Sequence, residues 1–263
     1  MNERYSCNAG AGVFPGTPGS RGEIIYEGKA KIVYQAESPG EVYMVFKDSA
    51  TAFDGKKKGT IKGKGYFNAH ISSILFKFLE EHGVRTHFIE LVDDVTLKTK
   101  KLRIFPIEVV VRNVVAGSLS KRTGRPEGEK LPFPILEFYY KSDELGDPMV
   151  NDDHILAFGM ATREEVASLR EKALKINSLL KPYFADRGLE LVDFKLEFGR
   201  VLNYSESGQE VLGEIVLGDE ISPDTCRFWD TSTGERLDKD RFRRDLGGVE
   251  EAYAEVLRRL GGR

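Results

Sequence analysis

The amino-acid sequence predicts a mixed α and β protein in two parts, and three features support this expectation. Residues 23–105 consist mostly of short segments in which apolar and polar residues alternate, as they do in β-strands. Residues 106–263 mix such segments with two long segments of helical apolar spacing. Pro106 stands between the two patterns, and we place a soft boundary there.

The first part is expected to hold strands and one amphipathic helix. Residues 23–28 and 30–36 predict a hairpin that closes around Gly28 and Lys29. Further strands are expected at residues 41–48, 86–92, 94–99 and 102–105. Residues 66–83 predict the helix, which ends at Gly83 and has one apolar side made of Phe67, Ile71, Ile74, Leu75 and Phe78.

The second part is expected to combine strands and helices. Strands are predicted at residues 107–116, 135–141 and 191–200, with residues 213–219 as the hairpin partner of the last. Short and long helices are predicted at residues 117–124, 162–184 and 247–260. Thr162 and Glu165 form a capping box at the start of the long helix, whose apolar stripe consists of Val166, Leu169, Ala173, Ile176 and Leu180.

Composition narrows the class of protein. Of the 263 residues, 40% are hydrophobic and 31% are charged, which is typical of globular proteins, and such a chain buries roughly 70–75% of its unfolded surface. The net charge of −3 offers no general electrostatic case for nucleic acid. No apolar run approaches the roughly 20 residues of a membrane helix.

The cysteines and the first 22 residues indicate a cytosolic protein. Cys7 and Cys226 provide neither a disulfide framework nor the spacing of a zinc site, which favours a reducing compartment. Residues 1–22 are rich in glycine and proline and lack the apolar core of a signal peptide. We expect a disordered tail, with a misassigned start codon as the second interpretation.

The segment LVDFKLEFGR, residues 191–200, has two unlike sides. Alternation places Asp193, Lys195 and Glu197 on one side and an apolar row on the other. Apolar segments flank it on both sides of the sequence, which favours an internal strand, where each unpaired charge would cost on the order of several kcal/mol. A metal, a bound ligand or the charges themselves must then compensate.

Glu197 and Asp219 are candidate metal ligands. They end two segments that are expected to pair, and magnesium in proteins usually takes one or two carboxylates together with water and nucleotide phosphates. The alternative is an internal ion-pair network with Lys195. The four histidines have neither a nucleophile nor metal spacing around them, and we assign them no role.

The segment VVVRNVVAGSLSKRTG, residues 109–124, is a candidate phosphate pocket. Arg112 lies on one face of a valine-rich strand with Glu108 and Val110, and a helix is expected to start at Gly117 and Ser118. The pocket would consist of Arg112, Ser118, Lys121 and Arg122. The alternative is that Ser118 only caps the helix and that the basic residues face water.

Two lysine-rich segments are further candidates for anion binding. In residues 26–34, a glycine turn and two lysines could lie over phosphates, or could form an ordinary hairpin with exposed lysines. Residues 54–65 are expected to form a loop that either closes over an anion or is a solvated linker, and its lysines are Lys56, Lys57, Lys58, Lys62 and Lys64. The chain has no Walker A sequence.

Five segments in this order together resemble the phosphoribosylaminoimidazole-succinocarboxamide synthase (SAICAR synthetase) family: YEGKAKIVY, VVVRNVVAGSLSKRTG, DPMVNDDHI, LVDFKLEFG and GDEISPDTCRFWD. The resemblance covers about residues 24–260. It implies a two-lobed α+β fold related to ATP-grasp enzymes, with a kinase-like nucleotide cleft between a β-rich lobe, residues 23–105, and an α/β lobe, residues 106–263. Family members are commonly oligomeric, so a homo-oligomer is expected.

The resemblance also implies the reaction and its cofactors. ATP and Mg²⁺ would drive the condensation of carboxyaminoimidazole ribonucleotide (CAIR) with L-aspartate, giving SAICAR, ADP and phosphate in de novo purine synthesis. A carboxyl-phosphate intermediate is the expected route, because a carboxylate is unreactive toward an amine until it is activated. The alternatives are a small-molecule kinase and a nucleotide-binding sensor without turnover.

The resemblance assigns site residues by their matching motifs. Those implied for ATP are Gly28, Lys29, Ala30 and Lys31 near the phosphates and Leu102, Arg103 and Ile104 at the adenine hinge. The metal ligands and catalytic acids would be Glu197 and Asp219, with Lys195 among the catalytic residues. Those implied for the substrates are Arg112, Ser118, Asp224 and Arg227, with Lys141 and Asp193 in matching motifs. Ile221 stands where many members carry phenylalanine.

Overall fold

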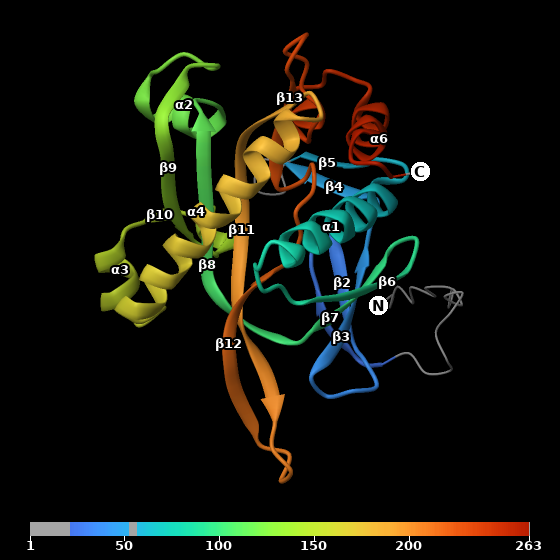
Figure 1. Cartoon of the computed structure of the whole chain (residues 1–263), viewed down its shortest axis with the longest axis vertical. Coiled ribbons are helices and arrows are strands. Elements are labelled where there is room, and N and C mark those ends of the chain that lie inside the picture. Colours follow the sequence, from blue (N-terminus) through green and yellow to red (C-terminus); the bar gives the residue numbers. More distant parts are fainter. Residues whose placement is uncertain (1–21, 53–56, 263) are drawn as a thin grey trace, which may run out of the picture.

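The computed structural model describes residues 22–52 and 57–262, and within them the chain is a mixed α+β protein with two main β-sheets (Figure 1). Residues 1–21 of the predicted tail, which include Cys7, lie outside the described residues, as does Lys56. Among the described helices, none has both the length and the apolarity needed to cross a bilayer.

The first sheet is antiparallel and comes from the first hundred residues. Its strands, in spatial order, are β1 (Ile24–Glu27), β2 (Lys31–Gln35), β3 (Glu41–Phe46), β7 (Thr96–Lys100) and β6 (Phe88–Asp93). Helix α1 (Lys64–Glu81) packs against β3, β6 and β7. The predicted hairpin around Gly28 is confirmed, because β1 pairs with β2 and the Gly28 amide donates to the Lys31 carbonyl over 2.9 Å.

Two predictions for the segment before α1 are corrected. Part of the expected glycine–lysine loop is a strand, β5 (Lys57–Thr60), which pairs with β4 (Ser49–Ala52) in a two-stranded sheet. The helix begins at Lys64, two residues earlier than expected, and Lys64 is fully buried. Its ammonium group has a carboxylate partner, and this ion pair compensates for the loss of water around the charge. The pattern of glycines and lysines could not reveal that Lys64 is buried.

The second sheet carries the longest strands of the described chain. Its order is β10 (Met149–Val150), β9 (Lys130–Tyr140), β8 (Leu102–Val114), β11 (Leu189–Tyr204) and β12 (Glu210–Gly218), and β13 (Cys226–Asp230) also pairs with β11. The predicted hairpin of residues 191–200 and 213–219 is confirmed as the pair β11–β12, which projects as a long arm in Figure 1.

Strand β8 runs through the predicted boundary. The sequence predicts one strand on each side of Pro106, whereas the structure has a single strand that contains Pro106. The pairing of β8 with β11 shifts between Glu108 and Ile104, where three residues of β8 stand opposite one residue of β11. Such an irregularity accommodates a residue that has no amide hydrogen for the ladder, so Pro106 does not end the strand.

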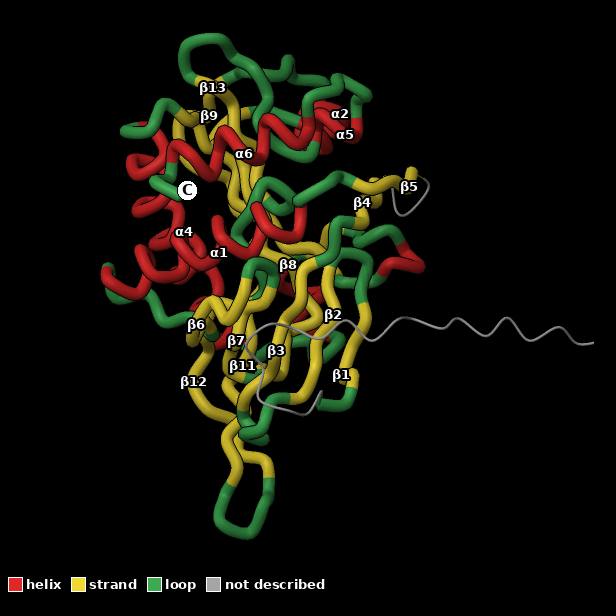
Figure 2. The backbone as a smooth tube through the Cα atoms, turned by 90° about the vertical axis from the view of Figure 1, so that its right-hand side faces the viewer, coloured by secondary structure: helices red, strands yellow, loops and turns green. Residues whose placement is uncertain are grey.

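The remaining helices cover the sheets. Helix α4 (Arg163–Ala185) packs on β8, β9 and β11, and α6 (Val249–Arg259) packs on α1 (Figure 2). Shorter helical segments are α2 (Gly117–Thr123), η1 (Asp143–Leu145), α3 (Asp152–Ala157) and α5 (Asp240–Arg243). The capping box of Thr162 and Glu165 is confirmed, and all five residues of the predicted α4 stripe are buried.

The predicted apolar side of α1 is partly wrong. Ile71 and Leu75 are buried as expected, but Phe67, Ile74 and Phe78 are only partly buried. Phe76 and Leu79 are fully buried instead. The helix packs on the sheet along one side and on α6 along another, which rotates its buried face relative to the stripe expected for one contact surface.

The two sheets meet near the end of β12. The His87 amide, at the start of β6, donates to the Leu217 carbonyl over 2.8 Å, and the Leu217 amide donates to Arg85 over 3.1 Å. These bonds tie the first sheet to the strand that leads into Asp219. They bring residues from both parts of the sequence to one charged surface.

Candidate active site

One face of the second sheet is charged, and the strand register produces it. Asp193, Lys195 and Glu197 of β11 lie opposite Arg112, Val110 and Glu108 of β8 respectively. The next strand, β9, adds residues opposite these β8 positions, Glu137 beside Val110 and Tyr139 beside Glu108. The opposite side of β11 is apolar and buried, as the alternation predicts, through Val192, Phe194, Leu196 and Phe198.

At one end of this face is a group that we call the lysine–acid cluster: Lys31, Glu108, Lys141, Lys195, Glu197, Asp219 and Glu220. Lys195 Nζ lies 2.5 Å from Glu108 Oε1 and 3.3 Å from Glu197 Oε1. Lys141 pairs with the other oxygen of Glu197. Strands β8 and β11, the residue that follows β9 and the segment after β12 therefore contribute side chains to one site.

Lys31 brings the first sheet into this cluster. Its ammonium group pairs with Asp219 and lies 2.8 Å from Glu220 Oε1. Burial would lower the pKa of Lys31, but the charges of Asp219 and Glu220 raise it above its ordinary value. Burial would likewise raise the pKa of Asp219, but Lys31 and Lys195 lower it. Both groups are therefore charged at neutral pH.

Asp219 has an unusual backbone conformation. Its φ of 57° lies in the left-handed region, which non-glycine residues rarely adopt. The residue follows the last position of β12, where Gly218 pairs with Glu197 of β11. This pairing places Asp219 one residue from the position opposite Glu197. Strained backbone of this kind persists where the surroundings enforce it, often at functional sites.

The other end of the charged face is what we call the arginine cluster: Arg112, Ser118, Arg122, Glu137, Tyr139, Asp193, Arg227 and Asp240. Arg112 donates from Nε to Glu137 over 2.7 Å and from Nη1 to Asp193 over 2.7 Å. Its Nη2 donates to the Ser118 hydroxyl over 2.9 Å. With its side chain 4% exposed, Arg112 does not face water, and the interpretation that the basic residues of this segment face water is wrong for Arg112.

Arg227 completes the arginine cluster from β13. It donates to both oxygens of Asp193, over 3.0 and 2.8 Å, and to Asp240 over 2.9 Å. Burial would lower the pKa of Arg227, but Asp193 and Asp240 raise it. A Cβ atom at Gly117 would lie 2.5 Å from the guanidinium, and Gly117 has a φ of 53°, so glycine is required for this approach.

Some residues of the predicted phosphate pocket are not where the sequence placed them. Ala116, not Ser118, is the N-cap of α2, and no side chain caps the helix. Arg122 joins the arginine cluster by pairing with Glu137, whereas Lys121 is exposed to solvent. The exposure of Lys121 depends on how the short helix packs on the rest of the protein rather than on local sequence.

Asp224 lies in a separate buried group. Its Oδ1 accepts from the Tyr253 hydroxyl over 2.6 Å, and its Oδ2 lies 2.9 Å from Lys64 Nζ and 3.5 Å from Lys239 Nζ. Burial would raise the pKa of Asp224, but the two lysines lower it. The carboxylate links α1, α6 and the segment before β13, and none of its described partners belongs to the arginine cluster.

The predicted ATP residues divide between two places. In the hairpin, Lys31 points into the lysine–acid cluster, while Lys29 pairs with the exposed Asp143 over 2.7 Å. At the predicted hinge, a Cβ atom on Gly218 would lie 2.8 Å from Leu102, so the Leu102 side chain lies beside the residue that precedes Asp219. This contact brings the start of β8 close to the lysine–acid cluster.

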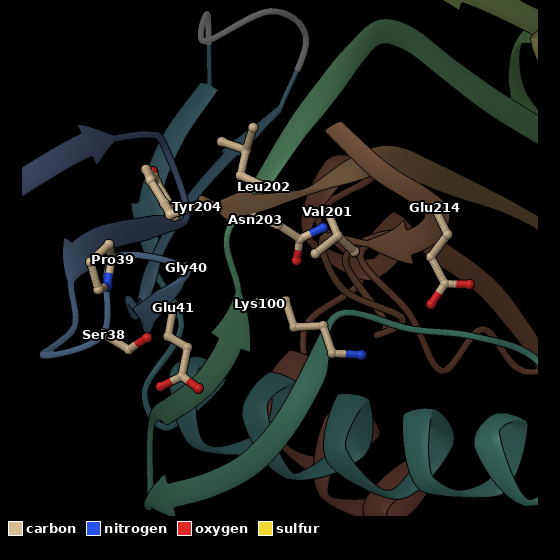
Figure 3. A pocket seen from close by; sticks show the side chains of 10 residues that line it. All are labelled: Ser38, Pro39, Gly40, Glu41, Lys100, Val201, Leu202, Asn203, Tyr204 and Glu214. Carbon is tan, nitrogen blue, oxygen red and sulfur yellow. The ribbon is translucent and has the colours of Figure 1, made fainter. Parts of the chain in front are cut away.

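Two pockets lie near the hinge strand. One, of about 470 Å³, is lined by Arg103 and Ile104 together with residues of the α3–α4 segment. The other, of about 490 Å³, lies between Glu41, Lys100 and Asn203 and holds none of the predicted site residues (Figure 3). The charged face itself, rather than either pocket, gathers the predicted catalytic residues.

Comparison with known proteins identifies the family. The model of the SAICAR synthetase family matches residues 24–260. A phosphoribosylaminoimidazole-succinocarboxamide synthase of Coprothermobacter proteolyticus is 55% identical over 239 residues, which cover 91% of this chain and 98% of the relative. The chain belongs to the SAICAR synthetase family. The alternative of a small-molecule kinase is not favoured by these relatives.

Solved structures of the SAICAR synthetase family have the same fold. The enzyme of Ehrlichia chaffeensis superposes with a TM-score of 0.87 at 49% identity, covering 92% of this chain and 99% of that chain. A SAICAR synthetase described in complex with ADP superposes with a TM-score of 0.83 at 53% identity, covering 92% and 98%. The fold class predicted from the resemblance is therefore confirmed as a mixed α+β fold of this family.

The metal expected for the family can be tested against the residues present. Among residues 22–52 and 57–262 there is no preformed group of three or more potential metal-ligating side chains. Magnesium needs fewer, because it usually takes one or two carboxylates and completes its shell with water and phosphates. Glu197 and Asp219 provide oxygen donors, and Asp219 uses only Oδ1 in its described ion pair. These two residues fit magnesium.

The structure also adds residues that the sequence did not single out. Glu137 and Tyr139 belong to the arginine cluster, and Glu220 belongs to the lysine–acid cluster. A signal for two of them was present, since Glu137, Tyr139 and Lys141 recur at the period of a strand within the segment ILEFYYK. Glu220 offers no such signal, because its neighbours form no regular pattern.

Proposed function

We propose that this chain performs the reaction of its family, the ATP-dependent condensation of CAIR with L-aspartate to SAICAR, ADP and phosphate, at the charged face of the second sheet. The observation that carries the proposal is the meeting of three lysines with carboxylates in the lysine–acid cluster, next to a second cluster rich in arginine. A reaction between anions requires such a surface, because positive charge offsets their repulsion.

ATP is proposed to bind between the two sheets, in a two-lobed arrangement with a cleft related to ATP-grasp and kinase folds. Lys31 and the hairpin from Gly28 to Ala30 would contact the phosphates, with Lys29 released from its exposed ion pair. The start of β8, residues 102–104, would meet the adenine, mainly through its backbone. The proximity of Leu102 to Gly218 supports this proposal, since it places the hinge beside the acids that are proposed to hold the metal.

The nucleotide phosphate of CAIR is proposed to bind at the arginine cluster. Arg112, Arg227 and Ser118 would donate to it, with Asp193 holding both guanidinium groups in position. The network of bidentate and charge-assisted hydrogen bonds supports this role, because it orients the guanidinium planes before a ligand arrives. Asp224 is proposed to contact the ribose, and its buried partners would restrict its orientation.

Glu197 and Asp219 are the proposed magnesium ligands. When bound, the ion would polarise phosphate oxygens and neutralise the charge that develops on them. The chain's own residues would align the reactants: Lys31 on the transferred phosphate, and Lys195 and Lys141 beside the carboxylate of CAIR. These lysines lie on three different strands or loops that converge at Glu197 and Asp219.

The reaction is proposed to pass through a carboxyl phosphate of CAIR. The CAIR carboxylate would take the γ-phosphoryl group, after which the amine of L-aspartate would attack the activated carbon and phosphate would leave. The described clusters contain carboxylates and basic groups, and Cys226 is buried with its pKa raised by burial, so it does not serve as a covalent nucleophile.

The test is ADP release by the purified protein with ATP, Mg²⁺ and CAIR, measured with and without L-aspartate. Release that depends on L-aspartate, with SAICAR formed in equal amount, is the expected result. Equal release without L-aspartate would indicate a kinase or an uncoupled ATPase, and ATP binding without any ADP release would indicate a sensor. A cytosolic location and a homo-oligomer stay predictions.

A further inference from the structure

Glu127, in the segment between α2 and β9, accepts hydrogen bonds from three separate parts of the chain. Its Oε1 accepts from the Gly117 amide over 3.1 Å and from Arg244 Nη2 over 2.5 Å. Its Oε2 accepts from Arg236 Nη2 over 2.9 Å. One carboxylate therefore joins the start of α2 to the chain that follows β13.

The two arginines hold this carboxylate in place. The pKa of Glu127 is lowered, chiefly by the hydrogen bond from Arg244, so Glu127 is charged at neutral pH. Bonds between a guanidinium and a carboxylate are shorter and stronger than bonds between neutral groups. With donors on both oxygens, the carboxylate has a defined position from which to bind the Gly117 amide.

Gly117 needs such a partner because neither its own conformation nor its helix restrains it. Its φ of 53° lies in the left-handed region, and glycine is the residue with the widest choice of backbone conformations. Its amide is in the first turn of α2, where no intrahelical acceptor is available, and the N-cap residue Ala116 provides no side-chain cap. Glu127 supplies the missing acceptor from ten residues further along the chain.

The backbone at Gly117 in turn limits the arginine cluster. A Cβ atom at Gly117 would lie 2.5 Å from Arg227 Nη2, so this backbone is packed directly against the guanidinium. The next residue is Ser118, whose hydroxyl accepts from Arg112 Nη2 over 2.9 Å. A shift of the Gly117 backbone would therefore move Ser118 and remove the surface on which Arg227 rests.

We propose that Glu127 is a positioning residue for the phosphate group of CAIR, an inference that rests on the proposed function. Glu127 holds Gly117, and Gly117 sets the places of Ser118 and Arg227, the donors proposed for that phosphate. Donors that already point at a ligand bind it more tightly, because no free energy is lost in ordering them. The described bonds of the Glu127 side chain include no member of the lysine–acid cluster, so its effect is limited to CAIR.

The first test compares Glu127→Ala with Glu127→Gln. Alanine removes the acceptor for Gly117, whereas glutamine keeps an acceptor oxygen at the same length and loses only the charge. We expect the KM for CAIR to rise by about 10-fold or more in Glu127→Ala, the loss expected for a hydrogen bond to a charged group, and by less than about 5-fold in Glu127→Gln. The kcat should stay within about twofold and the KM for ATP should not change, because only binding of one substrate is affected.

Glu129→Ala is the matched control. Glu129 lies two residues further along the same segment, and the described bonds of its side chain are all with Arg125. Its replacement should leave the KM values and kcat unchanged. If Glu127 acted only through its charge, both replacements at position 127 would lower the KM for CAIR equally, since a negative charge near a phosphate site would be gone. That result would overturn the proposal, as would a common rise in the KM values for CAIR and ATP.

A second measurement uses inorganic phosphate and does not depend on turnover. Phosphate that binds the folded protein should raise its urea midpoint, and we expect this rise for the unaltered protein and for Glu129→Ala but a much smaller one for Glu127→Ala. An equal rise in all three proteins, or none in any, would show that Glu127 does not position a phosphate site. If the unaltered protein forms no SAICAR, the proposed function fails, and the phosphate measurement still decides the role of Glu127.

Discussion

The arginine cluster and the lysine–acid cluster lie on the same sheet but stabilise their buried charges in different ways. In the arginine cluster, planar guanidinium groups make several directed bonds each, and both oxygens of Asp193 and Glu137 are used. In the lysine–acid cluster, single ammonium groups bridge neighbouring carboxylates, and Asp219 and Glu108 keep an oxygen uncommitted. The first is built to hold a fixed shape, and the second can still accept new partners.

This difference indicates which part of the charged face keeps a fixed geometry and which part can exchange its ion-pair partners. A guanidinium fork fixes the direction of each bond, whereas an ammonium group on a flexible chain can move to a new anion. Removing a residue should therefore cost stability as well as activity in the arginine cluster, and mainly activity in the lysine–acid cluster. The following variants test that contrast, from the largest expected effect to the smallest.

Arg112→Met should cause the largest loss of stability. It removes the shared partner of Glu137 and Asp193, whose side chains are 8% and 5% exposed, and leaves both carboxylates buried with fewer compensating charges. Breaking a buried ion pair in this way costs about 3–5 kcal/mol. Urea unfolding measures the free energy, with Lys141→Met in the other cluster as the comparison. A loss below about 1 kcal/mol for Arg112→Met would show that the network does not hold the fold.

Glu197→Gln should affect activity far more than stability. The amide keeps the size of the side chain but loses the charge that pairs with Lys141 and Lys195 and that is proposed to bind magnesium. We expect Mg²⁺-dependent ADP formation to fall by at least about 100-fold. Steady-state kinetics over a range of Mg²⁺ concentrations checks this. Near-normal magnesium-dependent turnover would contradict the metal assignment.

His87, which is buried beside the lysine–acid cluster, should make the free energy of unfolding decrease in acid. Burial lowers the pKa of His87 from an ordinary 6.5 to about 3, and neither ring nitrogen has a described hydrogen-bond partner. The unfolded chain takes up this proton below pH 6.5 while the folded chain stays neutral. Stability is therefore full above pH 6.5 and falls as the pH decreases toward 3, by about 1.5 kcal/mol between pH 6.5 and 5.

The pair His87→Leu and His82→Gln tests this slope. His82 is exposed, and its replacement is the matched histidine control. His87→Leu should flatten the decline between pH 6.5 and 5, since leucine binds no proton. Equal slopes for both variants would mean that other groups cause the acid sensitivity.

Lys29→Met should have the smallest effect on stability. The ion pair of Lys29 with Asp143 is at the surface, where the two side chains are 42% and 72% exposed. Exposed pairs contribute at most about 1 kcal/mol because water and salt screen them. A change within that limit, measured by urea unfolding, would agree with a lysine that is free to move to a ligand. A larger loss would place Lys29 among the structural residues.

Most of the fold could be predicted from local patterns. The capping box of Thr162 and Glu165 and the spacing of α4 predicted that helix nearly residue by residue. The alternation in residues 191–200 predicted both faces of β11. What the patterns missed depends on pairing: β8 continues through Pro106 because β11 accommodates an irregular register, and β5 forms because β4 lies beside it.

The candidate site divides in the same way. Ordered motifs of the sequence were enough to identify the family and to name Arg112, Lys195, Glu197 and Asp219. They could not show that Asp224 is held by Lys64 and Tyr253, or that Glu108 keeps an open oxygen beside Lys195. Alternation determines which side chains share a face of one strand. Only the tertiary structure decides which charges from distant segments meet there, because desolvation and Coulomb energies depend on distances that the sequence does not contain.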